Sequence, residues 1–309
     1  MRERMLSRRT VLSVLGAVGG ACLWPGAASG ASRAPVMTRT IPASGEQVAA
    51  VGMGTWITFN VGDDPALRNE RVKVLQAFFD MGGTLIDSSP MYGSSEEVIG
   101  YCLAHVTRAP PPFAATKVWT LLKMLGEHQI ERSRKLWGLD RFDLMQVHNL
   151  LNWESHLATL REEKVQGRLR YIGITTSHGR RHDEFEDVMR TEPLDFVQFT
   201  YNILDREAEK RLLPLAADRG LGVIINRPFA GGGLFDRFAR HPLPAWAREI
   251  DCADWAPFFL KFIISHPAVT CAIPATSRVD HMQENMGALH GRLPDQEMRA
   301  RMIQYVESL

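Results

Sequence analysis

Four polar side chains of this sequence could together deliver a proton to a carbonyl oxygen: Asp87, Tyr92, Lys117 and His148. A phenol has a solution pKa near about 10, so it gives up a proton readily at neutral pH only when a nearby cation stabilises the phenolate. Lys117 could supply that cation, and Asp87 could pair with Lys117 and hold it in place. The His148 ring could hydrogen-bond a carbonyl and orient it. The four residues therefore predict an acid for carbonyl reduction.

Three of these residues lie at the carboxyl end of a short apolar run. The runs are residues 84–87, 113–117 and 142–148, and Tyr92 follows five positions after the first. In a parallel barrel the carboxyl ends of the strands converge on one face. The spacing thus predicts a single site.

Strand-like runs alternate with helical patterns along most of the chain. Runs at residues 52–54, 85–87, 113–117, 144–148, 171–175, 196–201, 222–226 and 269–273 are separated by amphipathic segments. Asp64-Pro65 is typical of a helix start, with Leu67, Val74 and Phe78 on one face. Strict alternation favours a parallel sheet, and eight units favour a closed (β/α)₈ barrel in one domain.

The first 31 residues have the pattern of an export signal. Basic residues precede an apolar run and then small residues, and Arg8-Arg9 at the boundary is typical of a twin-arginine (Tat) signal. We expect a Tat signal peptide at 1–31, a linker at 32–46 and the barrel at 47–309. Residues 36–40 and 47–50 could alternatively pair as a hairpin that caps the barrel bottom. The sequence predicts periplasmic localisation, with an uncleaved anchor or a disordered tail as alternatives.

Composition excludes several other classes of protein. The chain has 309 residues, 45% of them hydrophobic, which is enough for one large core. A net charge of +1 gives no support to nucleic-acid binding. Its ten histidines form no zinc pattern with cysteine or carboxylate, so no metal is expected. Cleavage of the signal would leave no stable membrane span, because the apolar run is shorter than about 20 residues.

Eight strings resemble the aldo-keto reductase family, in the order of that family. They are Gly52-Met-Gly-Thr-Trp56, Asp87-Ser-Ser-Pro-Met-Tyr-Gly93, Thr116-Lys-Val-Trp119, Asp143-Leu-Met-Gln-Val-His148, Tyr171-Ile-Gly-Ile-Thr175, Gln198-Phe-Thr-Tyr-Asn202, Leu212-Leu-Pro-Leu-Ala216 and Ile273-Pro-Ala-Thr-Ser277, the last followed by Glu284-Asn285. The resemblance implies a barrel that transfers hydride between a nicotinamide cofactor and a small-molecule carbonyl substrate, with Tyr92 as acid.

The same resemblance implies a set of cofactor-binding positions. Gln198 falls where the family binds the nicotinamide amide, and Arg278 could clamp a 2′-phosphate. The glycines after residue 228 would let backbone N–H groups approach a pyrophosphate. The full expected set is Gly54, Thr55, Thr175, Gln198, Asn226, Pro228, Gly231, Gly232, Thr276, Arg278, Glu284 and Asn285.

Three positions depart from the family pattern. Thr175-Thr176 stands where many relatives carry Ser-Asn, Asn226 stands where many carry a stacking tyrosine, and Ala275 stands where some carry a lysine. The resemblance implies NADPH, with NADH as an alternative. Because the stacking tyrosine is absent, a non-catalytic nucleotide-binding regulatory or scaffold barrel is the alternative function.

Aromatic residues after the strand ends predict the walls of a substrate site. These residues are Trp56, Phe59, Trp119 and Trp153. Aromatic walls suit apolar or ring-shaped carbonyls and sugars stacked on their faces.

Overall fold

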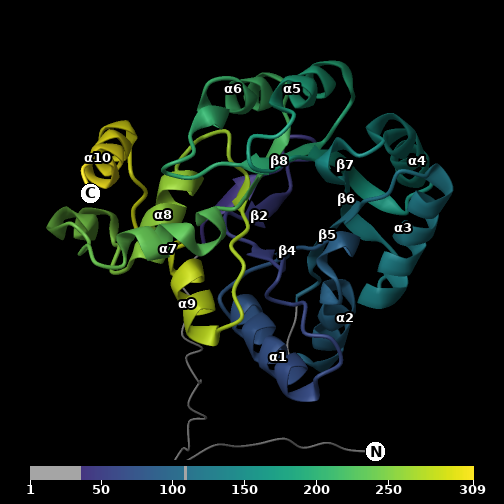
Figure 1. Cartoon of the computed structure of the whole chain (residues 1–309), viewed down its shortest axis with the longest axis horizontal. Coiled ribbons are helices and arrows are strands. Elements are labelled where there is room, and N and C mark those ends of the chain that lie inside the picture. Colours follow the sequence, from purple (N-terminus) through teal and green to yellow (C-terminus); the bar gives the residue numbers. More distant parts are fainter. Residues whose placement is uncertain (1–35, 108–109) are drawn as a thin grey trace, which may run out of the picture. The chain divides into compact units, whose positions relative to one another are not determined.

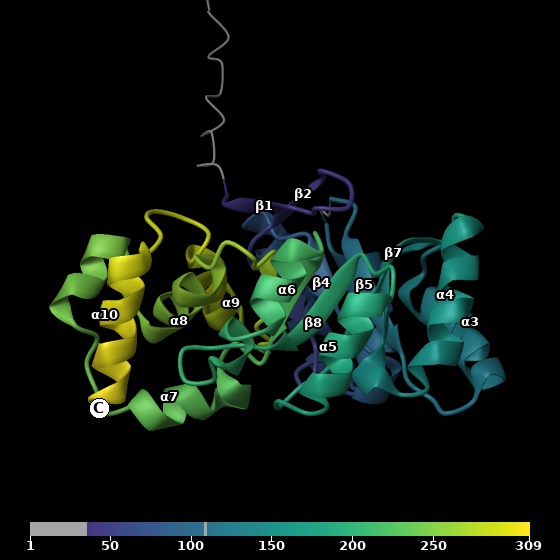
Figure 2. The same ribbon diagram turned by 90° about the horizontal axis from the view of Figure 1, so that it is seen from above.

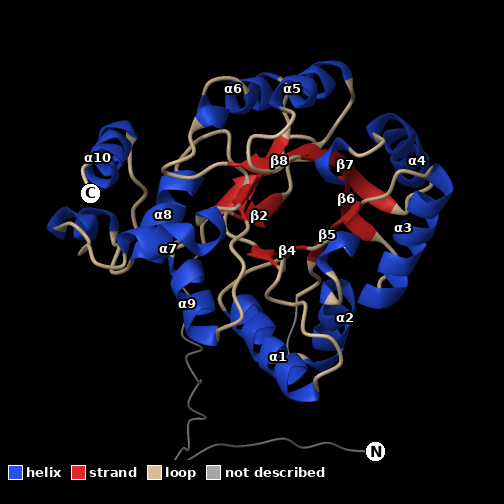
Figure 3. Ribbon diagram, in the orientation of Figure 1, coloured by secondary structure: helices blue, strands red, loops and turns tan. Residues whose placement is uncertain are grey.

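The barrel predicted from the sequence is present. The structure is a computed structural model that describes residues 36–309 except 108–109, so the expected signal peptide lies outside the described residues. Eight strands form one parallel sheet in chain order, wrapped into a ring with helices outside it (Figures 1 and 3). The strands are β3 (Met53–Gly54), β4 (Leu85–Asp87), β5 (Phe113–Val118), β6 (Phe142–Val147), β7 (Leu169–Thr175), β8 (Phe196–Thr200), β9 (Gly222–Asn226) and β10 (Cys271–Ala272).

The ring closes between its first and last strands. Isolated parallel bridges join Val51 to Ala272 and Gly54 to Ala275. The N–H of Gly52 donates to the Ala272 carbonyl at 2.8 Å. A Cβ at Gly52 would lie 2.7 Å from the Leu85 carbonyl oxygen, so the close approach of these strands requires glycine.

Helices cover the outside of the ring. They are α1 (Pro65–Asp80), α2 (Ser95–His105), α3 (Lys123–Trp137), α4 (Trp153–Val165), α5 (His182–Thr191), α6 (Leu212–Asp218), α7 (Gly233–Phe238), α8 (Trp255–Ile264), α9 (Val279–Gly287) and α10 (Gln296–Glu307). The predicted start of α1 is confirmed, since the Asp64 carboxylate caps the N–H groups of Ala66 and Leu67 at 2.8 and 3.1 Å. The inward placement of Leu67 was wrong, because its side chain is exposed while Val74 and Phe78 are buried.

A hairpin closes the amino-terminal end of the barrel. Strands β1 (Thr38–Thr40) and β2 (Gln47–Ala49) pair antiparallel. Ile41 and Val48 are buried in the cluster that fills the barrel, together with Leu85 and Phe113 from the strand starts. Figure 2 shows the hairpin on one side of the barrel and α7 on the other. The described part of the expected linker, 36–46, therefore belongs to the folded body, as the hairpin interpretation predicted.

Three further features of the described residues concern cysteines, metal sites and membrane-spanning helices. Cys102, Cys252 and Cys271 are free and buried. Across residues 36–309, apart from the gap at 108–109, no cluster of His, Cys, Asp or Glu could hold a metal ion. Within the same part of the chain, no helix is both long and apolar enough to cross a membrane.

Candidate active site

A cavity of about 450 Å³ opens at the carboxyl ends of the strands. Three of the four predicted acid-site residues, Asp87, Tyr92 and His148, line it. The fourth, Lys117, lies behind the lining as the last residue but one of β5. The convergence of strand ends thus brings the four together.

Asp87 and Lys117 form a buried ion pair at the centre of the site. Lys117 Nζ donates to Asp87 Oδ1 at 2.6 Å and to the Ser88 carbonyl at 2.7 Å, and the side chains are 0% and 2% exposed. Burial lowers the pKa of Lys117, and the neighbouring Asp87 opposes that shift. Gln198 and Gln146 donate to the second carboxylate oxygen at 3.0 and 3.3 Å. The carboxylate is therefore held on both oxygens.

Tyr92 lies on the 3₁₀ turn η1 (Pro90–Tyr92) with its ring beside the ion pair. Lys117 Nζ is 5.4 Å from the centre of the Tyr92 ring. Burial, with a smaller contribution from the Asp87 charge, raises the pKa of Tyr92 above its ordinary value. The hydrogen bonds of Lys117 Nζ go to Asp87 and to the Ser88 carbonyl. The phenol is consequently kept protonated, as a proton donor must be.

His148 is held in one orientation by Ser89. Ser89 Oγ lies 2.8 Å from His148 Nδ1 and accepts from the N–H of Met91 at 3.2 Å. Burial, reinforced by the Lys117 charge, lowers the pKa of His148 well below its ordinary value, so the ring is neutral. If the buried Ser89 hydroxyl donates to Nδ1, its own proton is satisfied and Nε2 carries the ring proton. That tautomer makes His148 a hydrogen-bond donor. Its ring stands edge-on to Tyr92, at 5.8 Å and 85°.

The predicted cofactor-binding residues fall into two groups. Eight of them line the cavity: Gly54, Thr55, Thr175, Gln198, Asn226, Pro228, Gly231 and Gly232. The other four, on the segment that leads into α9 and on α9 itself, are not among its described lining residues: Thr276, Arg278, Glu284 and Asn285. Arg278 is 61% exposed and ion-paired with Asp280. A 2′-phosphate would therefore have to compete with that carboxylate.

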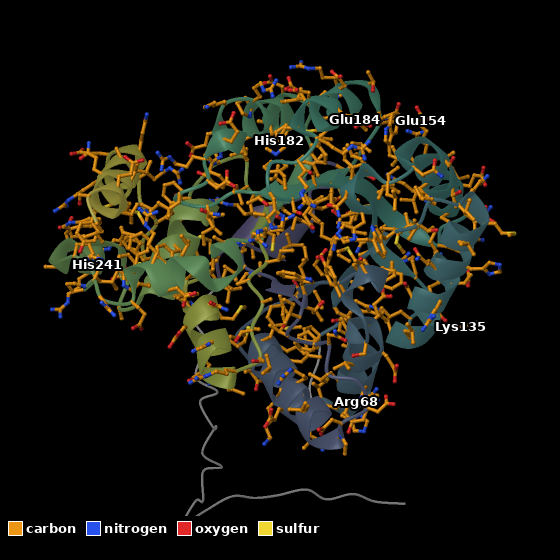
Figure 4. The ribbon with its side chains drawn as sticks, viewed as in Figure 1. Arg68, Lys135, Glu154, His182, Glu184 and His241 are labelled. Carbon is orange, nitrogen blue, oxygen red and sulfur yellow. The ribbon has the colours of Figure 1, made fainter. Side chains whose placement is uncertain are left out.

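Only one of the four predicted aromatic wall residues lines the cavity. Trp56 does so and is 44% exposed. The prediction for Phe59 is corrected, because its ring is fully buried in the core. Trp119 is exposed but outside the described lining. Trp153 packs on the core and donates from Nε1 to Glu184 at 3.2 Å, at the start of α5, where Figure 4 labels Glu184.

The cavity also contains residues that the sequence did not single out. Among them are Met91, His178, Arg180, Arg227 and His281. Arg227 directly follows β9, so its place at a strand end was the available signal. The loop positions of His178 and Arg180 gave no comparable signal, because their approach to Arg227 arises only when the strands are wrapped.

The lining residues fit a dinucleotide. Gly231 and Gly232 both have positive φ angles, 71° and 101°, and form a glycine cradle that brings no side chain of its own to the cavity wall. Arg227 lies beside that cradle, since a Cβ on Gly231 would be 3.1 Å from its Nη2. The amides of Gln198 and Asn226 also line the cavity, where Gln198 donates to Asp87 and Asn226 directly precedes Arg227. The cavity therefore offers cationic and backbone groups for phosphates and side-chain amides for a carboxamide ring.

Comparisons with known proteins agree with this geometry. A model of the aldo/keto reductase family matches residues 50–302. Aldo-keto reductase YhdN of Bacillus subtilis (strain 168) is 27% identical over 201 residues, or 60% of each chain, which is less than two thirds of that relative. Methylglyoxal reductase YeaE of Escherichia coli (strain K12) is 27% identical over 256 residues, covering 81% of this chain and 88% of that protein.

A solved structure shows the same similarity. It is an aldo/keto reductase from Klebsiella pneumoniae in complex with NADP and acetate, 25% identical, with a TM-score of 0.71 over 87% of this chain and 95% of that chain. The family match extends over most of the chain and includes all four residues of the acid site. The chain therefore belongs to the aldo/keto reductase family.

Proposed function

We propose that this protein reduces an aldehyde or ketone to an alcohol, with Tyr92 as general acid. As a member of its family the chain is an NAD(P)H-dependent oxidoreductase. The observation that carries the proposal is the pair of neutral rings, Tyr92 and His148, that stand edge-on to each other at the cavity wall. Both can donate a hydrogen bond to the same carbonyl oxygen.

Each residue of the site has a separate role in proton transfer. The bound nicotinamide supplies the hydride. His148 donates from Nε2 to the carbonyl oxygen and orients it, while the Tyr92 hydroxyl gives its proton as negative charge develops on that oxygen. The Lys117–Asp87 ion pair lies next to the Tyr92 ring, and Lys117 Nζ is 5.4 Å from the centre of that ring. Tyr92 is partly exposed and lines the cavity, so its hydroxyl can be reached by a bound carbonyl.

NADPH is the proposed cofactor, with NADH as the alternative. The Klebsiella pneumoniae relative was solved with NADP, and the cavity of this chain carries cations beside a glycine cradle. Small aldehydes and ketones are the proposed substrates, as supported by the methylglyoxal reductase name of one relative. Trp56 and Met91 supply an apolar wall on the cavity.

A Tyr92→Phe variant tests the function. We expect loss of aldehyde reduction by about 100-fold or more, with NADPH affinity unchanged, because the ring remains and only the proton donor is removed. Tyr101→Phe is the matched control, since Tyr101 donates to Asn69 outside the cavity. Unchanged reduction by Tyr92→Phe contradicts the proposal. Tight nucleotide binding by the wild type, with no cofactor consumed over a broad aldehyde panel, favours the regulatory or scaffold barrel instead.

We also propose that the protein is exported by the Tat route and acts in the periplasm. The support is the pattern of residues 1–31, which lie outside the described residues. Replacing Arg8-Arg9 by two lysines should retain the protein in the cytoplasm, as measured by fractionation and immunoblotting. Replacing Arg2 and Arg4 by lysines is the control. Equal export of both variants would contradict the proposal.

A further inference from the structure

Exposed apolar side chains of the described residues gather on one part of the cavity rim. Most of the large ones lie on the loops that follow β3, β4 and β5, which are neighbours in the sheet, and on the first turn of α3. Trp56 and Ile57 belong to this group and line the cavity. We call the other members the apolar strip: Met91, Trp119, Leu121, Leu122, Met124 and Leu125.

The loop between β5 and α3 is held in place by side chains behind it. Gln129 bonds both backbone groups of Trp119, accepting from its N–H and donating to its carbonyl, each at 2.9 Å. The Asn152 side chain donates to the Leu121 carbonyl at 2.9 Å. With its backbone bonded inward, the loop leaves Leu121 69% and Leu122 58% exposed. Apolar surface that is gathered and held in water in this way indicates a binding surface.

The strip starts between the two loops that carry the acid site. β5 lies between β4 and β6 in the sheet. Tyr92 follows β4, and His148 begins the 3₁₀ turn η2 (His148–Leu150) after β6, so the strip leaves β5 with one proton donor on each side. Met91, the residue before Tyr92, joins the strip to the cavity lining. The strip is therefore next to the place where a carbonyl would bind.

The expected nicotinamide site is on the other side of the ring. Gln198 and Asn226, whose amides suit the carboxamide, are on β8 and β9, and β9 is four strands away from β5 in the ring of eight. A nicotinamide held by those amides would face the carbonyl from that side. The substituents of the carbonyl would then point away from it, toward the strip.

The strip offers an occupant no unpaired charge. Lys123 is the single ionisable residue between Trp119 and Leu125, and its Nζ is 3.9 Å from Glu127 Oε1. An apolar surface whose one cation has an acidic neighbour favours an uncharged hydrocarbon group over an anion or a charged headgroup.

The cavity of about 450 Å³ must hold the nicotinamide end of the nucleotide as well as the carbonyl. The chain of a longer aldehyde would therefore continue over the rim. We propose that the apolar strip binds this chain, and that Leu121 and Leu122 make the enzyme prefer carbonyls with a long alkyl or aryl chain. The inference rests on the proposed reduction at Tyr92 and adds longer chains to its short substrates.

The first experiment measures kcat/KM with NADPH for propanal and for octanal. Each methylene group that moves from water onto the strip would strengthen binding by at most about fourfold, and contact on one side of the chain gives less. We expect the wild type to prefer octanal by about tenfold or more. The Leu121→Ser/Leu122→Ser double variant should lose most of this preference. Val165→Ser, an exposed valine at the end of α4, is the control and should keep it.

The second experiment measures binding without turnover. Calorimetry with 1-octanol and with 1-propanol, in the presence of NADP, gives the affinity of each alcohol. The wild type and Val165→Ser should bind octanol about tenfold more tightly than propanol, and the double variant should bind the two with similar affinity. Both leucines are exposed, so the double variant should fold, and its melting temperature checks this.

The proposal is overturned if the folded double variant keeps the wild-type preference for octanal and octanol, or if the wild type has no such preference. It is equally overturned if the double variant abolishes a wild-type dimer, or adsorption to phosphatidylcholine vesicles, while the preference stays. The strip would then be covered by a second copy of the chain or by a lipid surface.

These outcomes are separable from those of the proposed function. Reduction of propanal with no dependence on chain length leaves the reductase intact and removes the strip from substrate binding. Octanol binding that depends on Leu121 and Leu122 supports the strip even in a protein that reduces nothing.

Discussion

The acid site and the two arginines Arg180 and Arg227 share one cavity but are built in opposite ways. Lys117 and Asp87 sit on strands, nearly inaccessible to solvent, and each finds its partner in the other. Arg180 and Arg227 sit on loops, exposed or half-buried, and have no ion-pair partner among the described residues. The ion pair of the acid site is complete without a ligand, whereas Arg180 and Arg227 would gain an ion-pair partner only from a bound anion.

This difference separates two tasks. A proton donor must keep its geometry within a fraction of an ångström, which rigid strand ends and a closed ion pair provide. Recognition of a charged group benefits from cations that remain available at the entrance. Mutations in the acid site should therefore lower turnover and stability, whereas mutations of Arg180 or Arg227 should lower ligand affinity.

The largest effect is expected from Lys117→Met. It leaves Asp87 buried with no cation, so stability should fall by about 3–5 kcal/mol and turnover should be lost. Chemical denaturation and steady-state kinetics at low temperature measure the two effects. Lys123→Met, an exposed lysine on α3, is the control. A stable, active Lys117→Met variant would show that the ion pair is not part of the machinery.

Removing the Ser89 hydroxyl should lower turnover less than Lys117→Met does, and it should affect only the catalytic step. Without the hydroxyl, Nδ1 of His148 loses its partner and the ring can adopt the wrong tautomer. We expect Ser89→Ala to lower kcat by about tenfold with little change in KM for NADPH, and Ser89→Thr to recover most of that loss. NMR of the ring nitrogens of His148 measures the tautomer directly. An unchanged ring spectrum and kcat would contradict the assigned orientation.

A smaller effect concerns the pH dependence of stability. Because burial lowers the pKa of His148, the folded ring stays neutral below pH 6.5, where the unfolded ring binds a proton. The unfolded state then holds more protons, so stability falls as pH falls, by at most about 1.36 kcal/mol per pH unit. His148→Gln should remove the contribution of His148 to the slope of stability against pH between pH 6.5 and 5. Equal slopes in both proteins would mean that His148 titrates normally in the fold.

The smallest effect is expected from Arg278→Ala. Arg278 is exposed and ion-paired with Asp280, so its contribution to a 2′-phosphate is screened and shared. NADPH binding should weaken relative to NADH binding by about two- to fivefold. Fluorescence titrations with both nucleotides measure the ratio. Equal loss of the two nucleotides would remove Arg278 from the 2′-phosphate.

The sequence predicted the acid site better than the rest of the cavity because its residues end buried strands. Strand ends are set by local apolar runs, and closure of a parallel barrel brings them together. Side chains on loops have no such constraint. Trp56 and Phe59 follow the same strand three residues apart, yet one reaches the cavity and the other the core, after a turn in which Ile57 has a φ of 63°.

The contacts that could not be predicted from the sequence join residues far apart along the chain. Ser89 and His148 are separated by 59 positions, and nothing in either segment indicates that a hydroxyl fixes the ring. Arg227 was missed for a similar reason. Arg227 is half-buried with no ion pair among the described residues, and only the charge of Asp205 acts on it through space.

The seam between β3 and β10 has a consequence for local opening of the protein. Both strands are two residues long, and only a few backbone hydrogen bonds cross between them, such as Gly54 N–H to the Pro274 carbonyl at 2.9 Å. Amides here should exchange with solvent sooner than those of β5 or β6. Trp56 lines the cavity from one side of the seam and Ala275 from the other. An occupant that contacts both would hold the two strands together, so slower hydrogen exchange at these strands would report ligand binding without any measurement of turnover.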